Sequence, residues 1–378
     1  MKAAVQYEVG KPLVVDEVQL QDPQDDEIMV KIVACGVCHS DLTFMKGDMP
    51  APMPIVMGHE GAGIVEKVGP RVTSVKPGDH VLMMVSYSCG KCPLCAQGKP
   101  TQCVENLPVM MMACLPGTYG ATRLSKDGKP INHVFGLAAM AEYAVVKERS
   151  VVKVREDAPM DKICIMGCGI TTGMGAAINT TGMRPGESIV VYGSGGVGLS
   201  AIMGAKLAGA GKIIAVSRSD RKLAVAKELG ADHVVKSGAE DPVAKVKELT
   251  GGGADYAVEA VGKADVMMQA FGSIRNGGKL VVAGMAPLIE MLTIAPFEFL
   301  LGKCIVGTVQ GDIVHSVDVP RFVDMYMQGK IPLDKMISHT YKLAQVNEAY
   351  TALDKSEVVR SVVTVSYTHL TLPTKRIV

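Results

Sequence analysis

The pattern of hydrophobic and polar positions divides the chain into two parts. Up to about Val154, short apolar runs separated by Gly and Pro occur at 28–33, 63–68, 80–85 and 141–146. Short runs bounded by turn residues predict β-strands. We therefore expect the first part to be mostly β, with long loops.

From Ser188 onward, apolar strands alternate with helical segments. Strands are predicted at 188–192, 212–216, 233–235, 255–259, 279–283 and 305–309, and helices at 197–208, 220–229, 241–250 and 264–274. Six strands that alternate with helices predict an α/β fold with a doubly wound parallel sheet. Beyond Asp312 the pattern is helical and amphipathic, and it ends in a strand at 358–365 that we expect to return to the first part.

A length of 378 residues predicts two domains, or three at most. We expect residues 1–169 and 313–365 to form a discontinuous, mostly β domain, into which residues 170–312 are inserted as the α/β domain. Residues 366–378 continue no pattern, and we interpret them as a non-native tail or as a disordered C-terminus.

The charge balance argues against a polyanionic partner. Lys and Arg together number 39 and Asp and Glu 38, which gives a formal charge of +1. The longest uncharged stretch, 163–183, contains five glycines and four threonines and is a poor membrane span. The N-terminus reads as a strand and not as a secretory signal. We expect a cytoplasmic protein with a small-molecule substrate, and neither a nucleic-acid nor a membrane partner.

The cysteines carry the first chemical signal. In a chain without a secretory signal, ten cysteines are better explained as metal ligands and buried apolar residues than as disulfides. Cys89, Cys92, Cys95 and Cys103 have the spacing C-x2-C-x2-C-x7-C on a loop with Gly and Pro. Four thiolates complete a tetrahedral shell, which predicts a structural zinc site. An iron–sulfur cluster and scattered buried cysteines are the alternatives.

A glycine motif follows the first strand of the α/β part. The segment Gly193-Ser-Gly195-Gly196-Val197-Gly198 comes directly after a strand and before a helix, the order that a dinucleotide-binding fingerprint needs. Gly193 allows a tight turn and Gly195 lets the backbone approach a pyrophosphate. Gly198 allows the helix to pack closely on the strand.

A second set of metal-binding residue types is dispersed. Cys38 and His39 lie in the segment 35–41, His59 in Gly58-His-Glu-Gly-Ala-Gly63, and Cys168 in the Gly- and Thr-rich segment 167–173. Taken singly, each residue is better explained as a buried or a loop residue. Together with the four-cysteine loop and the glycine motif, they resemble the zinc-dependent medium-chain alcohol dehydrogenase family, in its liver-type and aryl-alcohol branch, as far as about residue 365.

The resemblance implies a GroES-like catalytic domain, a Rossmann domain and a catalytic zinc ion held by Cys38, His59 and Cys168. Such a donor set leaves one coordination position open for a substrate oxygen. Asp41 would orient His59, and Glu60 would lie close behind the metal. The alternative for both carboxylates is a solvated position on a loop.

The resemblance also implies a route for the substrate proton. Ser40 matches the family's hydroxyl that takes this proton. Thr43 stands where liver-type members carry a relay histidine, and threonine does not titrate near neutral pH. We expect the proton to leave through water or through His39.

Further cofactor contacts follow from the same resemblance. His39 and Arg360 would contact the pyrophosphate, and Thr172 and Val197 the nicotinamide. Ser217 and Arg218 occupy the strand end where an NAD site places a carboxylate, with Lys222 one helical turn further on. A hydroxyl beside cations favours the 2′-phosphate of NADP(H). The alternative is a solvated Arg218 in an enzyme that uses NAD or both cofactors.

The expected substrate pocket is wide. The resemblance places Val85, Val134, Phe135 and Met285 near the zinc ion and Met110–Met112 on a long loop at the entrance. Small side chains where relatives carry rings, together with adaptable methionines, favour a bulky aromatic, allylic or cyclic alcohol or carbonyl compound. The methionines could instead fill the core.

Two other functions stay open. One is an NAD-dependent polyol or formaldehyde-adduct dehydrogenase of the same superfamily, and the other is a non-catalytic nucleotide-binding scaffold. The resemblance further implies a homodimer through the sheet edge near 305–309, or a tetramer of such dimers.

Overall fold

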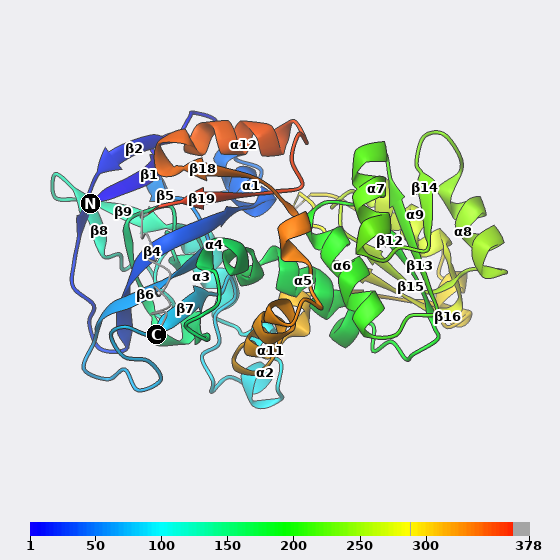
Figure 1. The fold of residues 1–378 in the computed structure, drawn as a ribbon, viewed down its shortest axis with the longest axis horizontal. Helices are drawn as coiled ribbons and strands as arrows, with labels where there is room; N and C mark the ends of the chain where they lie inside the picture. The colour runs from blue at the N-terminus through cyan, green and yellow to red at the C-terminus, as the bar shows by residue number, and fades with distance from the viewer. Residues whose placement is uncertain (288, 366–378) are drawn as a thin grey trace, which may run out of the picture.

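The computed structural model describes residues 1–287 and 289–365, so the predicted tail at 366–378 lies outside the described residues. Figure 1 shows a β-rich part that contains both ends of the described chain, beside an α/β part made from the middle of the chain. Helices α5 (Gly169–Gly175), α6 (Gly196–Leu207) and α11 (His315–Met327) lie between the two parts.

The α/β part is built on a parallel sheet of six strands in the order β14-β13-β12-β15-β16-β17. This confirms the predicted doubly wound sheet. The strands are β12 (Ser188–Tyr192), β13 (Lys212–Ser217), β14 (His233–Lys236), β15 (Ala254–Glu259), β16 (Ile274–Val282) and β17 (Cys304–Gly307). The helices are α6, α7 (Asp220–Leu229), α8 (Pro242–Thr250), α9 (Ala264–Gly272) and α10 (Phe297–Leu300).

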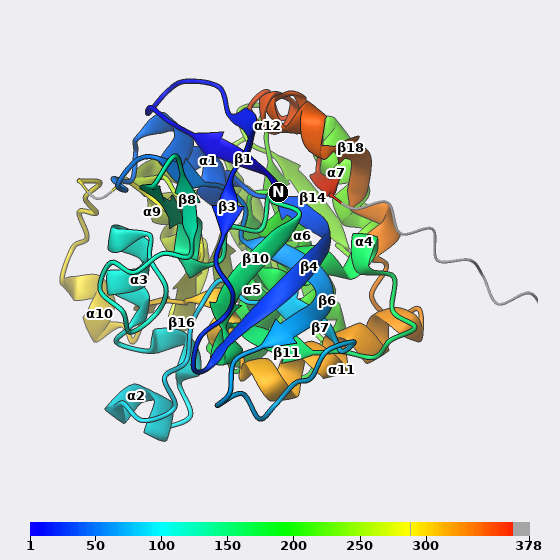
Figure 2. The same ribbon diagram turned by 90° about the vertical axis from the view of Figure 1, so that its left-hand side faces the viewer.

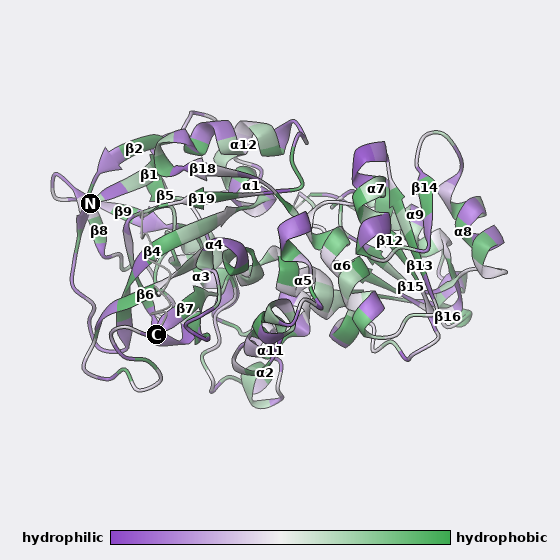
Figure 3. Cartoon of the chain, in the orientation of Figure 1, coloured by the Kyte–Doolittle hydropathy of each residue, from purple (hydrophilic) through white to green (hydrophobic). Residues whose placement is uncertain are grey.

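Side-chain burial explains why these runs form strands. The last four residues of β12 and the middle four of β13 are buried, as expected of strands covered by helices on both faces. Figure 3 shows mostly hydrophobic residues along this sheet, whereas α7 and α8 alternate hydrophobic and hydrophilic stretches. The prediction failed at one boundary. The helix predicted at 264–274 ends at Gly272, because Ile274 pairs with Ala254 and begins β16.

The β-rich part contains two further sheets. The first consists of β1 (Lys2–Gln6), β2 (Val14–Glu17), β3 (Gln19–Leu20), β5 (Ile55–Val56), β8 (Leu124–Lys126) and β9 (Lys129–His133). The second consists of β4 (Glu27–Val37), β6 (Glu60–Val68), β7 (His80–Met83), β10 (Tyr143–Lys147), β11 (Val151–Lys153), β18 (Ile337–Lys342) and β19 (Arg360–Thr364). Its helices are α1 (His39–Lys46), α2 (Pro93–Ala96), α3 (Asn106–Met112), α4 (Met160–Ile163) and α12 (Val346–Asp354).

The C-terminal segment returns to the β-rich part, as predicted. Strand β19 pairs antiparallel with the centre of the second sheet, with Ser361 opposite Val37. Figures 1 and 2 both show α12 beside α1, and Lys46 of α1 forms an ion pair with Asp354 of α12. The exact domain boundaries, at 169/170 and 312/313, stay predictions.

Two helices bring the parts into contact. A side chain at Gly173 of α5 would place its Cβ 2.0 Å from the carbonyl oxygen of Val197 in α6. Only glycine therefore permits this approach, which brings the neighbouring Thr172 close to the start of α6.

The long loop expected to carry Met110–Met112 is partly regular. Met110–Met112 lie on helix α3, and the hairpin of β8 and β9 follows. The placement of these methionines on a loop was therefore wrong. Methionine is a good helix former, but a run of seven residues that contains Pro108 is too short to show helical periodicity.

The edge of the parallel sheet is open at β17, which pairs only with β16 among the described strands. Large apolar side chains nearby are exposed: Ile289, Met291, Phe297, Phe299 and Leu300. The homodimer through this edge stays a prediction.

No single helix in the described part of the chain is long and apolar enough to cross a membrane. The segments Met160–Gly167 and Gly169–Thr180 pass that test only as a pair, and this pair is bent by 58°. Most of its residues are buried in the core between the two parts of the molecule.

Candidate metal centres and cofactor cleft

The four-cysteine loop converges on one point. The sulfurs of Cys89, Cys92, Cys95 and Cys103 all lie within 4.8 Å of one another. Sγ of Cys89 is 4.0 Å from that of Cys95, and Sγ of Cys92 is 4.0 Å from that of Cys103. Four sulfurs around zinc, each at about 2.3 Å, would lie about 3.8 Å apart. The loop therefore fits a tetrahedral metal ion without rearrangement.

The dispersed residues converge as well. The side chains of Cys38, His59, Glu60 and Cys168 bring their ligand atoms within 4.8 Å of one another. Cys38 follows β4 and precedes α1, and Cys168 precedes α5. The N-terminus of α1 favours the anionic form of Cys38, whereas the contact with Cys38 and burial raise the pKa of Cys168 well above its ordinary value.

The donor atoms of this centre have the chemistry of a metal site. Nε2 of His59 is buried and has no hydrogen-bond partner among the described residues. A hydrogen bond from Cys168 lowers the pKa of Cys38 well below its ordinary value, and His59 adds to this effect. Two thiols, one of them poised as a thiolate, and an unsatisfied imidazole nitrogen are a donor set that fits zinc.

Asp41 orients the histidine, as predicted. Its Oδ1 accepts a hydrogen bond from Nδ1 of His59 at 2.8 Å and from the backbone N–H of Gly58 at 3.3 Å. This leaves Nε2 of His59 as the atom that faces the cysteines. Asp41 has no exposed surface, so it is not a solvated loop carboxylate.

The other partner of Asp41 could not be predicted from the sequence. The hydroxyl of Tyr350, on α12, donates to Oδ2 of Asp41 at 3.0 Å. No local motif marks Tyr350, and the two residues are 309 positions apart. Only the return of the C-terminal segment brings them together.

Glu60 is also buried, and a cation faces it. Its Oε1 accepts a hydrogen bond from the backbone N–H of Gly169 at 3.0 Å, and its Oε2 forms an ion pair with Arg360. Burial raises the pKa of Glu60 to about 7, and the guanidinium of Arg360 acts in the opposite direction. The solvated alternative is therefore excluded for Glu60 too.

The predicted proton route lies beside the metal centre. Oγ of Ser40 is 3.7 Å from Sγ of Cys38, and Ser40 is partly exposed. The hydroxyl of Thr43 donates to the backbone oxygen of His39 at 3.0 Å, so its proton is engaged within α1. The side chain of His39 is exposed.

The glycine motif has the predicted form. Gly195 precedes α6, and a Cβ added to it would meet no atom within 4 Å. A Cβ at Gly196 would lie 2.6 Å from Cδ of Arg360. Arg360 therefore reaches from Glu60 to the N-terminus of α6, where we expect a pyrophosphate. Thr172 donates to the backbone oxygen of Cys168 at 2.7 Å, and the next residue, Gly173, contacts α6.

At the predicted adenosine end, the strand position where an NAD site places a carboxylate carries a hydroxyl group. Ser217 ends β13, and the exposed Arg218 follows it. Lys222 is half-buried on α7. The nearest acidic residue in the sequence, Asp220, forms an ion pair with Lys236.

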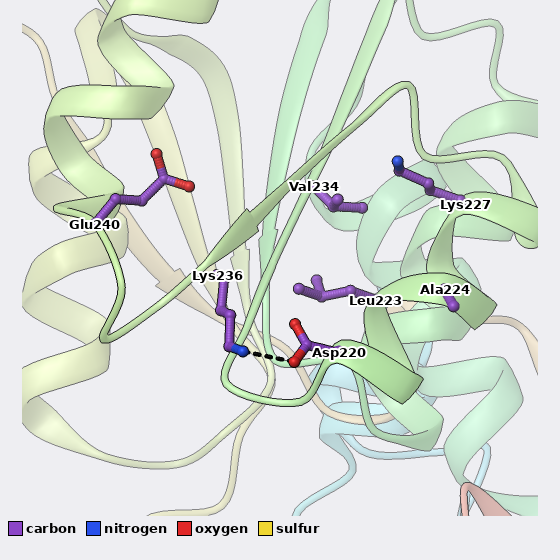
Figure 4. A pocket seen from close by; sticks show the side chains of 7 residues that line it. All are labelled: Asp220, Leu223, Ala224, Lys227, Val234, Lys236 and Glu240. Carbon is purple, nitrogen blue, oxygen red and sulfur yellow. Dashed lines mark hydrogen bonds and ion pairs between the residues drawn. The ribbon is translucent and has the colours of Figure 1, made fainter.

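A cavity of about 310 Å³ lies beside this region but does not contain the predicted contacts. Figure 4 shows Asp220 and Lys236 paired in it, with Leu223 and Val234 between α7 and β14. Neither Ser217 nor Arg218 lines it.

The predicted pocket residues differ in their positions. The ring of Phe135 packs on the ring of His59, with centroids 4.8 Å apart. Val85 and Met110 are partly buried against the same core, and Met285 is 41% exposed. Val134 is completely buried, which leaves its assignment to the pocket wall without support.

Comparison with known proteins agrees with this geometry. Residues 24–156 match the alcohol dehydrogenase GroES-like domain, and residues 196–326 match the zinc-binding dehydrogenase domain. The chain is 41% identical to an S-(hydroxymethyl)glutathione dehydrogenase of Paracoccus denitrificans over 96% of this chain and 99% of that protein. It is also 41% identical to an alcohol dehydrogenase class-3 of Cereibacter sphaeroides, with the same coverage.

The benzyl alcohol dehydrogenase of Acinetobacter calcoaceticus has a similar structure, with a TM-score of 0.92 and 37% identity. The similarity covers 97% of this chain and 99% of that one. The domain matches, the full-length relatives and the converging donor atoms lead to one conclusion. The chain belongs to the zinc-dependent medium-chain alcohol dehydrogenase family.

Proposed function

We propose that this oxidoreductase transfers a hydride between NADP(H) and a hydrophobic alcohol or carbonyl compound, with aromatic alcohols as the first class to test. The observation that carries this proposal is the absence of cations from two segments, one that packs beside the metal centre and one that follows β16 at the carboxyl end of the parallel sheet. Residues 104–122 and 284–300 contain no Lys or Arg and three glutamates. A neutral substrate fits such surroundings better than an anionic one.

The place of these segments in the fold supports the argument. A Cβ at Gly136 would lie 3.2 Å from Cγ1 of Val109, so α3 packs against the turn whose Phe135 contacts His59. Residues 284–300 follow β16, and the backbone of Met285 lies against Gly262 at the carboxyl end of the parallel sheet. Ligands bind at this edge in open α/β sheets.

The chain's own groups would act as follows. Cys38, His59 and Cys168 would hold the zinc ion, and Asp41 would keep the histidine in the correct tautomer. When bound, zinc supplies a Lewis acid for the substrate oxygen. Ser40 accepts the alcohol proton and passes it on, by water or through His39, because the hydroxyl of Thr43 is engaged by the backbone.

A second candidate substrate is S-(hydroxymethyl)glutathione. The names of the 41%-identical relatives favour it more directly than they favour an aromatic alcohol. The argument against it is chemical. A glutathionyl group carries two carboxylates, and the segments 104–122 and 284–300 offer them no cation.

A substrate panel separates these candidates. We expect kcat/KM for benzyl alcohol to exceed that for formaldehyde plus glutathione, and that for sorbitol, by at least about tenfold, because unpaired substrate carboxylates and hydroxyls lose binding energy in an apolar cleft. Steady-state rates with both cofactors provide the measurement. A higher kcat/KM for the glutathione adduct would replace the first proposal by the second.

The cofactor preference has its own test. We expect Ser217→Asp to lower the ratio of kcat/KM for NADP to that for NAD by about 100-fold, because a carboxylate would repel the 2′-phosphate and accept hydrogen bonds from a free ribose. Ser316→Asp, at an exposed position of α11, is the control. Equal or better use of NAD by the unmodified enzyme would contradict the proposal.

A further inference from the structure

We propose that Tyr350 is a positioning residue of the catalytic metal centre. Its hydroxyl would fix Asp41, and through Asp41 the imidazole of His59, so that the centre binds zinc tightly. This inference rests on the zinc centre of the proposed function. It adds a residue from the far end of the chain to that centre.

The contacts form an unbroken series. The hydroxyl of Tyr350 donates to Oδ2 of Asp41 at 3.0 Å, and Oδ1 of Asp41 accepts from Nδ1 of His59 at 2.8 Å. Tyr350 is 2% exposed, and Asp41 and His59 are fully buried. Water therefore has no access that would let it replace the tyrosine.

Each oxygen of Asp41 has a different task. Oδ1 holds His59 and the backbone N–H of Gly58. Among the contacts of the described residues, Oδ2 has only the Tyr350 hydroxyl. A buried carboxylate oxygen without a donor is costly, so without the hydroxyl Asp41 would gain by turning toward other donors. Such a turn would weaken its hold on Nδ1 of His59.

The phenol is suited to this task. Burial raises the pKa of Tyr350 well above its ordinary value, and the neighbouring carboxylate of Asp41 adds to the shift. The hydroxyl therefore stays protonated and donates. Its position is fixed by α12, whose buried face lies in the same core cluster as Leu42, Phe44 and Met45 of α1.

The substitution Tyr350→Phe removes the hydroxyl and keeps the ring. Outer partners of metal ligands are worth about 10–100-fold in metal affinity, and we expect about tenfold because Tyr350 acts through Asp41. The matched control is Tyr192→Phe. Tyr192 is 1% exposed in the α/β part, and its hydroxyl is bonded to Ser273, away from both metal centres.

Zinc affinity is measured by competition with a chromophoric chelator at fixed pH on the full-length protein. The unmodified protein should hold two zinc ions per chain. Tyr350→Phe should weaken one of them about tenfold, and Tyr192→Phe should weaken neither. Cobalt substitution gives a second readout, because a displaced imidazole shifts the d–d absorption bands of the catalytic centre. Thermal unfolding of both variants shows whether either change is merely structural.

Each outcome has one meaning. Unchanged zinc affinity and unchanged cobalt bands in Tyr350→Phe would overturn the inference, and so would equal losses in the two variants. If the unmodified protein binds zinc only at the four-cysteine loop, the proposed function fails as well. If it binds two ions and Tyr350→Phe retains both equally well, the inference alone fails.

Discussion

At pH 9, above the pKa of about 7 that Glu60 has beside its cation, Arg360→Met should destabilise the protein by about 3 kcal/mol, because the carboxyl must then be buried either without its cation or protonated. Glu60 has no exposed surface and Arg360 is 4% exposed, so water cannot take the place of the guanidinium. Methionine keeps most of the apolar volume of the side chain. The decrease in the free energy of unfolding therefore measures the loss of the guanidinium charge and not a loss of packing. The midpoint of urea unfolding, compared at equal slope, is the measurement.

The same substitution at an exposed ion pair is the control. Arg71 pairs with Asp25 at the surface, where both side chains are more than half exposed. Arg71→Met should cost at most about 1 kcal/mol, since exposed pairs are screened by solvent. Equal effects of the two substitutions would show that Glu60 is neutral, or that it finds another partner when Arg360 is lost. In either case the ion pair of Arg360 with Glu60 would contribute little to stability.

Most of the fold could be predicted because its elements are marked locally. Helix α7 begins where Ser219 accepts a hydrogen bond from the backbone of Lys222, and α8 begins where Asp241 caps a helix with proline in its first turn. Strands of the parallel sheet are buried on both faces and read as continuous apolar runs. At Ile274 the local sequence favours a continued helix, but pairing with Ala254 of β15 makes this residue the start of a strand.

The metal centres were predictable to different degrees. The four-cysteine loop lies within one short segment, so spacing alone marks it. Cys38, His59 and Cys168 gain meaning only together, through the order of their motifs. The partners of Asp41 and Glu60 had to come from structure, because Tyr350 and Arg360 approach them only when β19 pairs with β4.

The contact of Arg360 with Glu60 was missed for a different reason. Family resemblance suggested a role for Arg360 at the pyrophosphate, and the structure adds the ion pair behind the metal centre. One side chain thus touches Gly169 beside the metal ligand Cys168 and Gly196 at the start of α6. Because Arg360 contacts both the metal centre and the start of α6, its sequence position alone does not show which of these two sites it serves.

Two substitutions in the glycine motif should affect different properties, one the stability of the fold and the other the binding of the cofactor. Gly198→Ala should destabilise the protein by about 3 kcal/mol, at the upper end for overpacked sites, because the new Cβ would lie 1.7 Å from the backbone oxygen of Gly193. Helix α6 would have to move away from β12. The Cβ meets backbone and not a flexible side chain, so no rotamer change can relieve the clash. Urea unfolding should show the loss in the absence of cofactor.

Gly195→Ala should give the opposite result. Its added Cβ meets no atom within 4 Å, and its φ of −84° suits alanine. The free energy of unfolding should therefore change by less than about 1 kcal/mol. That empty space is where we expect the pyrophosphate, and the methyl group should weaken NADPH binding by about 100-fold in a fluorescence titration. Unchanged affinity would mean that the pyrophosphate does not approach Gly195. A large loss of stability would mean that the space is needed for folding.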